Sequence, residues 1–171
     1  MRLAVIIPCY NHAHYVGEAL ESVLSQARGA DRVIVIDDGS QDESLNVLRS
    51  FESRGVEVSA QDNAGAHETL NRLVEKAAVD CELVAILNSD DTYLPSRLER
   101  CLPAFEQQKD LAVLSTAFEL MNDDGQELDG ESSRVKWFRA AWALRGRDFA
   151  EWRGIWNFTA TTSNGRAGAG T

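Results

Sequence analysis

The stretch VAILNSDDTY, residues 84–93, runs an apolar segment directly into two adjacent carboxylates, Asp90 and Asp91. A continuous apolar run of this kind is typical of a strand that is covered on both faces of a parallel sheet. Two neighbouring carboxylates repel each other, so they need exposure to water or a compensating partner. A bound cation would be one such partner, and the stretch therefore connects the fold to a candidate site.

Comparable apolar runs recur along the first two thirds of the chain. They occupy residues 3–7, 33–36, 83–87 and 111–114, with a weaker run at 56–59. Helical patterns lie between them, at residues 15–26, 43–53, 68–78 and 95–107. This alternation predicts an α/β fold, with a mostly parallel Rossmann-like sheet flanked by helices.

Local signals refine the predicted helices. Ser40 and Glu43 stand at capping-box spacing before the second one. Pro95 suits the first turn of the fourth helix, whereas Pro103 does not suit an interior. We therefore expect the fourth helix to kink or break near Glu99.

The last third of the chain has a different character. Asp124 and Gly125 predict a turn between two short strands. Beyond residue 132 the chain is rich in aromatic residues, which favours a helix face packed over the sheet, with a docking surface for a second copy as the alternative. The final SNGRAGAGT is predicted to be a flexible tail. The aromatic residues are Trp137, Phe138, Trp142, Phe149, Trp152 and Trp156.

Composition limits the classes of function. A chain of 171 residues fits a single domain. The net charge of −10 and the lack of a Lys and Arg cluster argue against nucleic-acid binding. No apolar stretch is long enough to cross a membrane, so a cytoplasmic protein is expected, with peripheral membrane association left open. The three scattered cysteines, Cys9, Cys81 and Cys101, indicate reduced and mostly buried thiols.

The predicted topology brings acidic residues together. Loops that follow parallel strands gather at one edge of the sheet, so Asp37, Asp38, Asp90 and Asp91 should converge there. The four loop stretches that follow the expected strands contain neither Lys nor Arg. They are PCYNHAHY, DDGSQD, QDNAG and NSDDTY. A hard divalent cation, Mg²⁺ or Mn²⁺, would relieve the repulsion and would share its remaining positions with the phosphates of a ligand.

Four motifs in order resemble the family 2 glycosyltransferases, which have a GT-A type fold for nucleotide-diphospho-sugars. They are VIIPCYNHAHYVGEALESVLSQ (5–26), VIVIDDGSQDES (33–44), DNAGAHETLNRLVEKA (62–77) and LVAILNSDDTYLPSRLER (83–100). The resemblance implies a single, incomplete domain over 1–171. In it, residues 1–115 bind the nucleotide sugar, and residues 116–171 begin the acceptor-side part with the flexible tail.

The resemblance also implies roles for particular residues. Pro8 and Tyr10 would line the base pocket, and Asp38 would accept a hydrogen bond from a uracil-like base. Each role suits the chemistry, since a tyrosine ring can stack and a carboxylate can accept a base N–H. Asn63 and Gly65 would form a tight loop whose backbone can approach phosphate or sugar closely.

The acidic motif would hold the metal and the sugar nucleotide. Asp91 is the expected metal ligand, and Asp90 would contact ribose, sugar or metal. Asn88 stands where family members often have Asp, so the side chain at this position is a neutral amide instead of a carboxylate. The implied donor is a nucleotide-diphosphate sugar, most simply a UDP-sugar, with Mn²⁺ or Mg²⁺ as the cofactor.

The implied reaction is an inverting displacement onto a hydroxyl of a saccharide or lipid-linked acceptor. The metal would stabilise charge on the departing nucleoside diphosphate. No general base is identified, because neither Asp148 nor Glu151 fits the family pattern, and the chain resembles a C-terminally truncated member. The alternative is therefore a nucleotide-sugar-binding remnant that transfers nothing.

Other readings of the sequence are weaker. The first loop lacks the G-x-G-x-x-G series of a dinucleotide oxidoreductase. A phosphoacceptor domain would place its acidic pair after the first strand and a lysine after the fifth, and the LSTAF stretch has none. His12, His14 and His67 are expected to be exposed loop residues rather than metal ligands.

Overall fold

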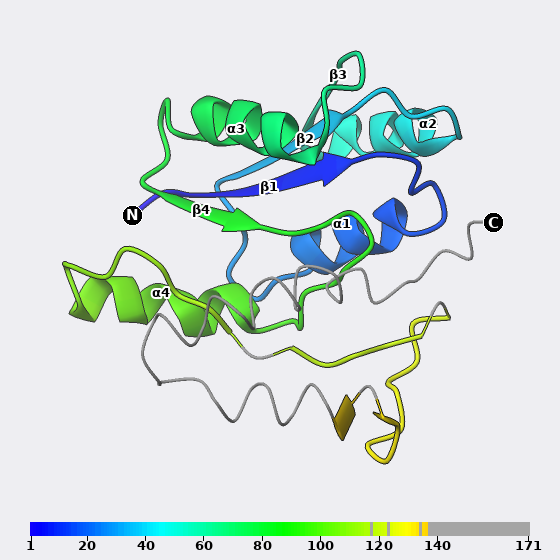
Figure 1. The fold of residues 1–171 in the computed structure, drawn as a ribbon. Coiled ribbons are helices and arrows are strands. Elements are labelled where there is room, and N and C mark those ends of the chain that lie inside the picture. Colours follow the sequence, from blue (N-terminus) through cyan, green and yellow to red (C-terminus); the bar gives the residue numbers. More distant parts are fainter. Residues whose placement is uncertain (117, 123, 134, 137–171) are drawn as a thin grey trace. The chain divides into compact units, whose positions relative to one another are not determined.

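The computed structural model describes residues 1–136 except 117, 123 and 134. The chain forms two compact units, Met1–Leu114 and Ser115–Thr171. The first unit contains a four-stranded sheet in the order β3-β2-β1-β4, and every pairing in it is parallel (Figure 1). Its strands are β1 (Leu3–Cys9), β2 (Arg32–Asp37), β3 (Val56–Ala60) and β4 (Leu83–Ile86).

Helices connect these strands, as the apolar pattern predicts. They are α1 (Val16–Leu24), α2 (Ser44–Ser50), the short 3-10 helix η1 (Glu52–Arg54), α3 (Ala66–Ala77) and α4 (Arg97–Gln107). In Figure 1, α1 and α3 lie on opposite faces of the sheet. The predicted α/β fold with a parallel sheet and flanking helices is confirmed.

The central strand β1 forms the middle of the core. Alternate side chains of a strand point to opposite faces, and both faces of β1 are buried. Val5 and Ile7 pack in a cluster with α1, α2 and α4, whereas Ala4 and Ile6 pack with α3. Burial on both faces explains why this strand reads as a continuous apolar run.

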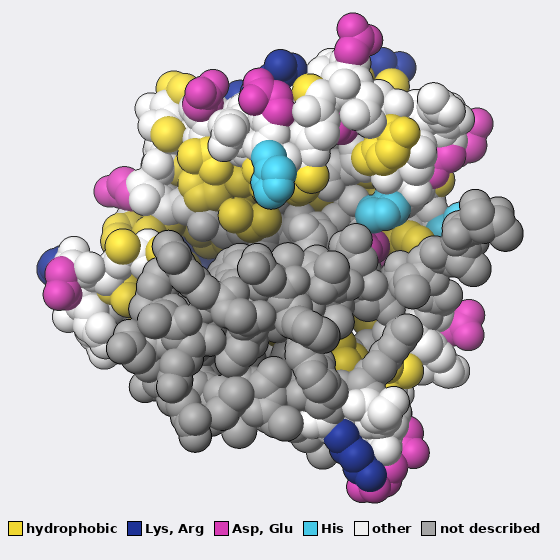
Figure 2. Space-filling model, viewed as in Figure 1, with side chains coloured by type: hydrophobic (Ala, Val, Ile, Leu, Met, Phe, Trp, Pro, Cys, Tyr) yellow, Lys and Arg dark blue, Asp and Glu magenta, His cyan; other side chains and the backbone are white. Residues whose placement is uncertain are grey.

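The outer strand β4 is less covered. Figure 2 shows hydrophobic side chains gathered on the surface between α3 and β4. Val74 of α3 and Val84 and Ile86 of β4 are exposed, the last by 52%. Val84 and Ile86 are in register with Ala4 and Ile6, so they belong to the face of the sheet that α3 covers at β1.

Two predicted helix starts are wrong. Glu43 occupies the N-cap position of α2, and no side chain forms a capping hydrogen bond with that helix. Ser40 accepts the backbone N–H of Asn11 instead, because the loop after β2 turns back toward the loop after β1. Pro95 precedes α4, which begins at Arg97.

Of the expected kink or break in α4, the break is wrong, since the helix continues through Pro103 to Gln107. A kink near Glu99 stays a prediction. A proline at this position leaves the carbonyl of Glu99 without its helical partner. Pro103 and Glu99 are both exposed. Water can therefore solvate the freed carbonyl, and the helix tolerates the proline.

The predicted strand at residues 111–114 is wrong. In the described part of the chain only β1 to β4 form the sheet, and Val113 is 79% exposed. A strand needs a hydrogen-bonded neighbour and a buried face, and this segment has neither among those residues. Its apolar composition alone does not produce a strand.

The second unit contains the predicted turn. Gly125 has a φ of 76°, and its N–H donates to the carbonyl of Asn122. The flanking residues form a single antiparallel bridge, Met121 to Glu127, rather than two short strands. The aromatic region, the tail, Asp148 and Glu151 lie outside the described residues.

A search of the described residues for membrane-spanning helices finds none that is long and apolar enough.

Candidate functional site

The site candidates lie at the carboxyl edge of the parallel sheet. Asp37 is the last residue of β2 and Asp38 follows it, while Asp90 and Asp91 follow β4. Parallel strands end at the same edge, so both acidic pairs belong to it. This much of the sequence prediction holds.

The expectation that all four carboxylates would converge on one ion is wrong for the described residues, in which no group of three or more acidic, His or Cys side chains could hold a metal. The physical reason is the strand order. β1 lies between β2 and β4, and neighbouring strands are about 4.8 Å apart, so the two loops start about 10 Å from each other. Only the pair after β4 remains a metal candidate.

Asp38 holds the loop that precedes α3. Its Oδ1 accepts hydrogen bonds from the Gln61 side chain at 2.7 Å and from the Ala64 N–H at 2.8 Å. Its Oδ2 accepts the Gly65 N–H at 2.9 Å. The side chain is only 3% exposed. Thr69 also hydrogen-bonds this carboxylate.

The same contacts set the charge state of Asp38. Burial raises the pKa of this carboxyl, but the hydrogen bonds from Ala64, Gln61, Thr69 and Gly65 together outweigh burial and leave the pKa below its ordinary value. Asp38 is therefore ionised at neutral pH, so both of its oxygens can accept hydrogen bonds from N–H donors.

Asp37 points to a different environment. Its Oδ2 accepts the Ser40 N–H at 3.0 Å, whereas its Oδ1 is buried without a hydrogen-bond partner among the described residues. Buried carboxylate oxygens are normally paired. Asp37 thus holds the loop after β2 through Ser40 from a buried position.

Two glycines allow the loops to approach each other. Gly39 has a φ of 75°, and a Cβ on it would lie 2.8 Å from the backbone nitrogen of Asn63. Gly65 has a φ of 88° and a ψ of 155° and is the N-cap residue directly before α3. Only glycine adopts these angles readily, so the loops carrying Asp38 and Asn63 depend on both residues. Asn63 and Gly65 are themselves exposed.

Residues 88–91 form a tight turn, named here the acidic turn. The Asp91 N–H donates to the Asn88 carbonyl at 3.1 Å, and the Asn88 side chain donates to Asp91 Oδ2 at 2.9 Å. Ser89 and Asp90 are buried and Asp91 is half-buried. Asn88, which departs from the resembled family, therefore orients the carboxylate of Asp91.

A histidine that the sequence did not single out as functional contacts the acidic turn. His12 Nδ1 lies 2.7 Å from Ser89 Oγ, in a partly buried hydrogen bond. The expectation of an exposed loop histidine is wrong for His12, which is half-buried, and confirmed for His14. His67 is exposed but belongs to α3 rather than to a loop. The sequence gives little indication of the contact between His12 and Ser89, because the two residues are 77 positions apart and no local periodicity relates them.

The end of β1 supplies the two other predicted residues. Tyr10 is 43% exposed, so its ring is accessible for stacking, and Pro8 is half-buried. Between them, burial raises the pKa of the Cys9 thiol to about 11, against hydrogen bonds from Ser89 and Ser44 that lower it. Cys9 is thus a neutral, buried thiol at physiological pH and not a nucleophile.

The donor set of the acidic turn suits a hard divalent cation. Asp90 and Asp91 offer carboxylate oxygens, which Mg²⁺ and Mn²⁺ prefer. Such ions commonly take one or two protein carboxylates and fill the other positions with water and substrate phosphates. The donor atoms present therefore suit this kind of metal, and Asp91 and Asp90 are the residues that would hold it.

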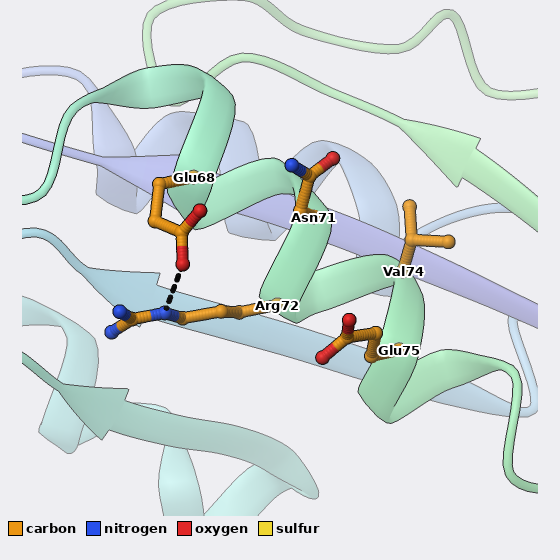
Figure 3. A pocket seen from close by; sticks show the side chains of 5 residues that line it. All are labelled: Glu68, Asn71, Arg72, Val74 and Glu75. Carbon is orange, nitrogen blue, oxygen red and sulfur yellow. Dashed lines mark hydrogen bonds and ion pairs between the residues drawn. The ribbon is translucent and has the colours of Figure 1, made fainter.

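A hollow on the outward surface of α3 is unrelated to these residues (Figure 3). Glu68, Asn71, Arg72, Val74 and Glu75 line it, and Glu68 forms an ion pair with Arg72. None of the predicted site residues belongs to this surface. The carboxyl edge of the sheet thus remains the candidate site.

Such a parallel sheet with flanking helices and polar loops at its carboxyl edge is the architecture of Rossmann-like nucleotide-binding folds. The profile described as glycosyl transferase family 2 matches residues 4–163. The chain belongs to this family.

Individual relatives agree with that membership. The putative teichuronic acid biosynthesis glycosyltransferase TuaG of Bacillus subtilis is 33% identical over 130 residues, which cover 74% of this chain and 50% of TuaG. An uncharacterized glycosyltransferase of Nostoc, alr2836, is 29% identical over 78% of this chain and 42% of its own length. The chain thus spans half or less of these relatives.

The fold also matches solved structures. The S. aureus TarS fragment 1–349, in complex with UDP, superposes with a TM-score of 0.59 over 70% of this chain and 39% of that structure, at 22% sequence identity. The same fragment is known in complex with UDP-GlcNAc. At this identity the likeness concerns the fold, which is the GT-A type expected from the sequence.

Proposed function

We propose that this chain binds a nucleoside-diphosphate sugar, most simply a UDP-sugar, at the carboxyl edge of its sheet and takes part in transferring the sugar to an acceptor hydroxyl. The observation that carries the proposal is the acidic turn at the end of β4, on the same edge as Asp38 and the loop of Asn63 and Gly65. Membership of glycosyl transferase family 2 supports it. The first unit would carry the donor site.

The base would be bound by residues after β1 and β2. The exposed ring of Tyr10 offers a stacking surface, with Pro8 beside it in the chain. Asp38 would accept a base N–H through its ionised carboxylate. The backbone at Asn63 and Gly65 would lie against phosphate or sugar, where a side chain at Gly65 would be strained.

Asp91, with Asp90, would hold Mn²⁺ or Mg²⁺ next to the diphosphate. When bound, such an ion stabilises negative charge on a departing nucleoside diphosphate, a contribution of several kcal/mol. The role of Asn88 is to orient the Asp91 carboxylate through its 2.9 Å hydrogen bond. A neutral amide can do this without adding repulsion to the acidic pair.

The transfer itself is proposed as an inverting displacement onto a saccharide or lipid-linked acceptor. A general base is required to take the acceptor proton, and no described residue is assigned this role. The chain spans half or less of its curated relatives. A second candidate is a donor-binding protein that transfers nothing on its own, since no described residue is assigned as the general base.

The donor site is tested by thermal unfolding of the full chain with UDP or GDP, each with and without MnCl₂. Ligand at a hundred times its dissociation constant should stabilise the protein by about 2.7 kcal/mol. We expect the larger shift for UDP with Mn²⁺. The same thermal response with and without Mn²⁺ would contradict the metal-dependent donor site.

Variants locate the site. Asp91→Asn should abolish the Mn²⁺-dependent part of the response, whereas Glu99→Gln, an exposed carboxylate on α4, should leave it unchanged. An equal response in wild type and Asp91→Asn would overturn the assignment of Asp91. Release of UDP from UDP-sugars in the presence of acceptors then separates the transferase from the donor-binding protein, which binds but releases none.

A further inference from the structure

We propose that His12 is a positioning residue for the acidic turn: its imidazole holds Ser89, and through Ser89 it sets the orientation of Asp90 and Asp91. The inference deepens the proposed function and rests on it for its functional meaning. Its structural basis is the 2.7 Å contact between His12 Nδ1 and Ser89 Oγ. It needs no contact between His12 and any ligand.

The backbone of His12 is fixed by its neighbours. Its N–H donates to Ser44 Oγ at 2.8 Å, at the start of α2. Its carbonyl accepts the N–H groups of Tyr15 and Val16 at 3.0 and 2.9 Å, where α1 begins. The imidazole therefore projects from a segment that is held by two helices, and its position does not depend on the acidic turn.

The receiving end of the contact is buried. Ser89 is 2% exposed and lies between Asn88 and Asp90 in the turn. Ser89 also hydrogen-bonds the Cys9 thiol, so removal of the imidazole takes away one of the partners of a buried hydroxyl. This loss costs free energy, and the turn is expected to shift. Asn88 and Asp91 close the turn from within, but these contacts are local to residues 88–91. The His12 contact ties the turn to the loop after β1.

This link has a consequence for the proposed donor site. Tyr10 lies two residues before His12, and Asp90 directly follows Ser89. The His12–Ser89 hydrogen bond thus joins the segment proposed for the base to the segment proposed for the metal. Groups that hydrogen-bond metal ligands without contacting the metal typically affect metal affinity by about 10- to 100-fold.

The test compares four single variants and one double variant with the wild type. His12→Ala removes the imidazole, and His12→Asn keeps a polar atom at about the place of Nδ1. Ser89→Ala removes the other partner. His14→Ala is the matched control, because His14 is an exposed histidine two residues away.

The first readout requires no ligand. Hydrogen exchange of the Asp91 amide, followed by NMR, reports the turn, because this N–H donates to the Asn88 carbonyl. We expect exchange about tenfold faster in His12→Ala and in Ser89→Ala. His12→Asn should restore most of the protection, and His14→Ala should match the wild type.

The second readout is the affinity for Mn²⁺ in the presence of UDP, measured by calorimetry. His12→Ala should weaken it about tenfold. The double variant with Ser89→Ala should be no weaker than Ser89→Ala alone, because Ser89→Ala already removes the contact with His12, together with the contact to Cys9. Strictly additive losses would overturn the inference. So would wild-type exchange at Asp91 in His12→Ala.

The two proposals fail in different ways. A wild type that does not bind UDP with Mn²⁺ contradicts the proposed donor site, while the exchange data still decide whether His12 positions the turn. If His12→Ala does not fold, hydrogen exchange of the Asp91 amide in His12→Asn and Ser89→Ala decides whether His12 positions the turn. Wild-type exchange in Ser89→Ala would then overturn the inference.

Discussion

At the scale of single residues, the loops of the site depend on backbone conformations and on carboxylates that act within the protein. Gly39 combines a φ of 75° with a 2.8 Å approach to the nitrogen of Asn63. Asp38 combines burial with three N–H donors, from Gln61, Ala64 and Gly65. Gly and Asp are common turn residues, so the sequence alone predicts only a turn at these two positions. In the structure, each of them joins the loop after β2 to the loop before α3.

Replacing Gly39 by alanine should destabilise the protein more than the same change at Gly55. Both have a positive φ, which costs an alanine about 1–2 kcal/mol, but a Cβ at Gly55 meets nothing within 4 Å. At Gly39 it would also collide with backbone, so we expect a total loss of at least about 3 kcal/mol. Urea unfolding measures both variants, and equal losses would contradict the proposed close packing.

Asp38→Asn should lower the free energy of unfolding by about 2 kcal/mol, because an amide nitrogen would face a backbone or side-chain N–H donor. Asp62→Asn is the control, since Asp62 is an exposed residue of the same loop and a change there should cost about 0.5 kcal/mol or less. Chemical denaturation compares the two. If the Asp38 variant were as stable as the control, the carboxylate would not be holding the loop.

At the scale of secondary-structure elements, α3 shows how one helix separates core from surface within consecutive residues. Leu73 is fully buried against β1 and β2, whereas Val74 is 42% exposed. We expect Leu73→Ala to cost about 2–5 kcal/mol and Val74→Ala less than about 1 kcal/mol. Equal losses in thermal or urea unfolding would mean that α3 packs with a different face.

At the scale of the whole molecule, several carboxylates link stability to pH. A hydrogen bond from the Leu3 N–H lowers the pKa of Asp31, and a hydrogen bond from Arg32 lowers the pKa of Glu57. The pKa of Asp38 is lowered as well. A carboxyl whose pKa is lower in the folded state contributes stability above its unfolded pKa, and this stability is lost as the pH falls through the folded value.

The free energy of unfolding should therefore decrease as the pH falls below about 4, the range of unperturbed Asp and Glu. Urea unfolding at pH 7, 5, 4 and 3 measures this dependence. Asp31→Asn, which removes one of the titrating groups, should flatten the decrease. A free energy of unfolding that stays constant or rises between pH 5 and pH 3 would contradict the assigned ion pairs and hydrogen bonds.

The sequence by itself determined the α/β class, the four strands and the helices between them. Burial on both faces of a parallel sheet produces continuous apolar runs, such as residues 3–7, and helices show their own period. It also indicated the edge of the sheet that carries the acidic residues. The run at 111–114 misled, because apolar composition cannot reveal whether a neighbouring strand exists.

Only the tertiary structure decided which polar groups meet. The order β3-β2-β1-β4 places β1 between the two acidic loops and keeps their four carboxylates from forming one cluster. The contacts of His12 with Ser89 and of Asp38 with Gly65 join residues that are 77 and 27 positions apart. Hydrogen bonds of this range depend on strand order and loop conformation, which no local periodicity encodes.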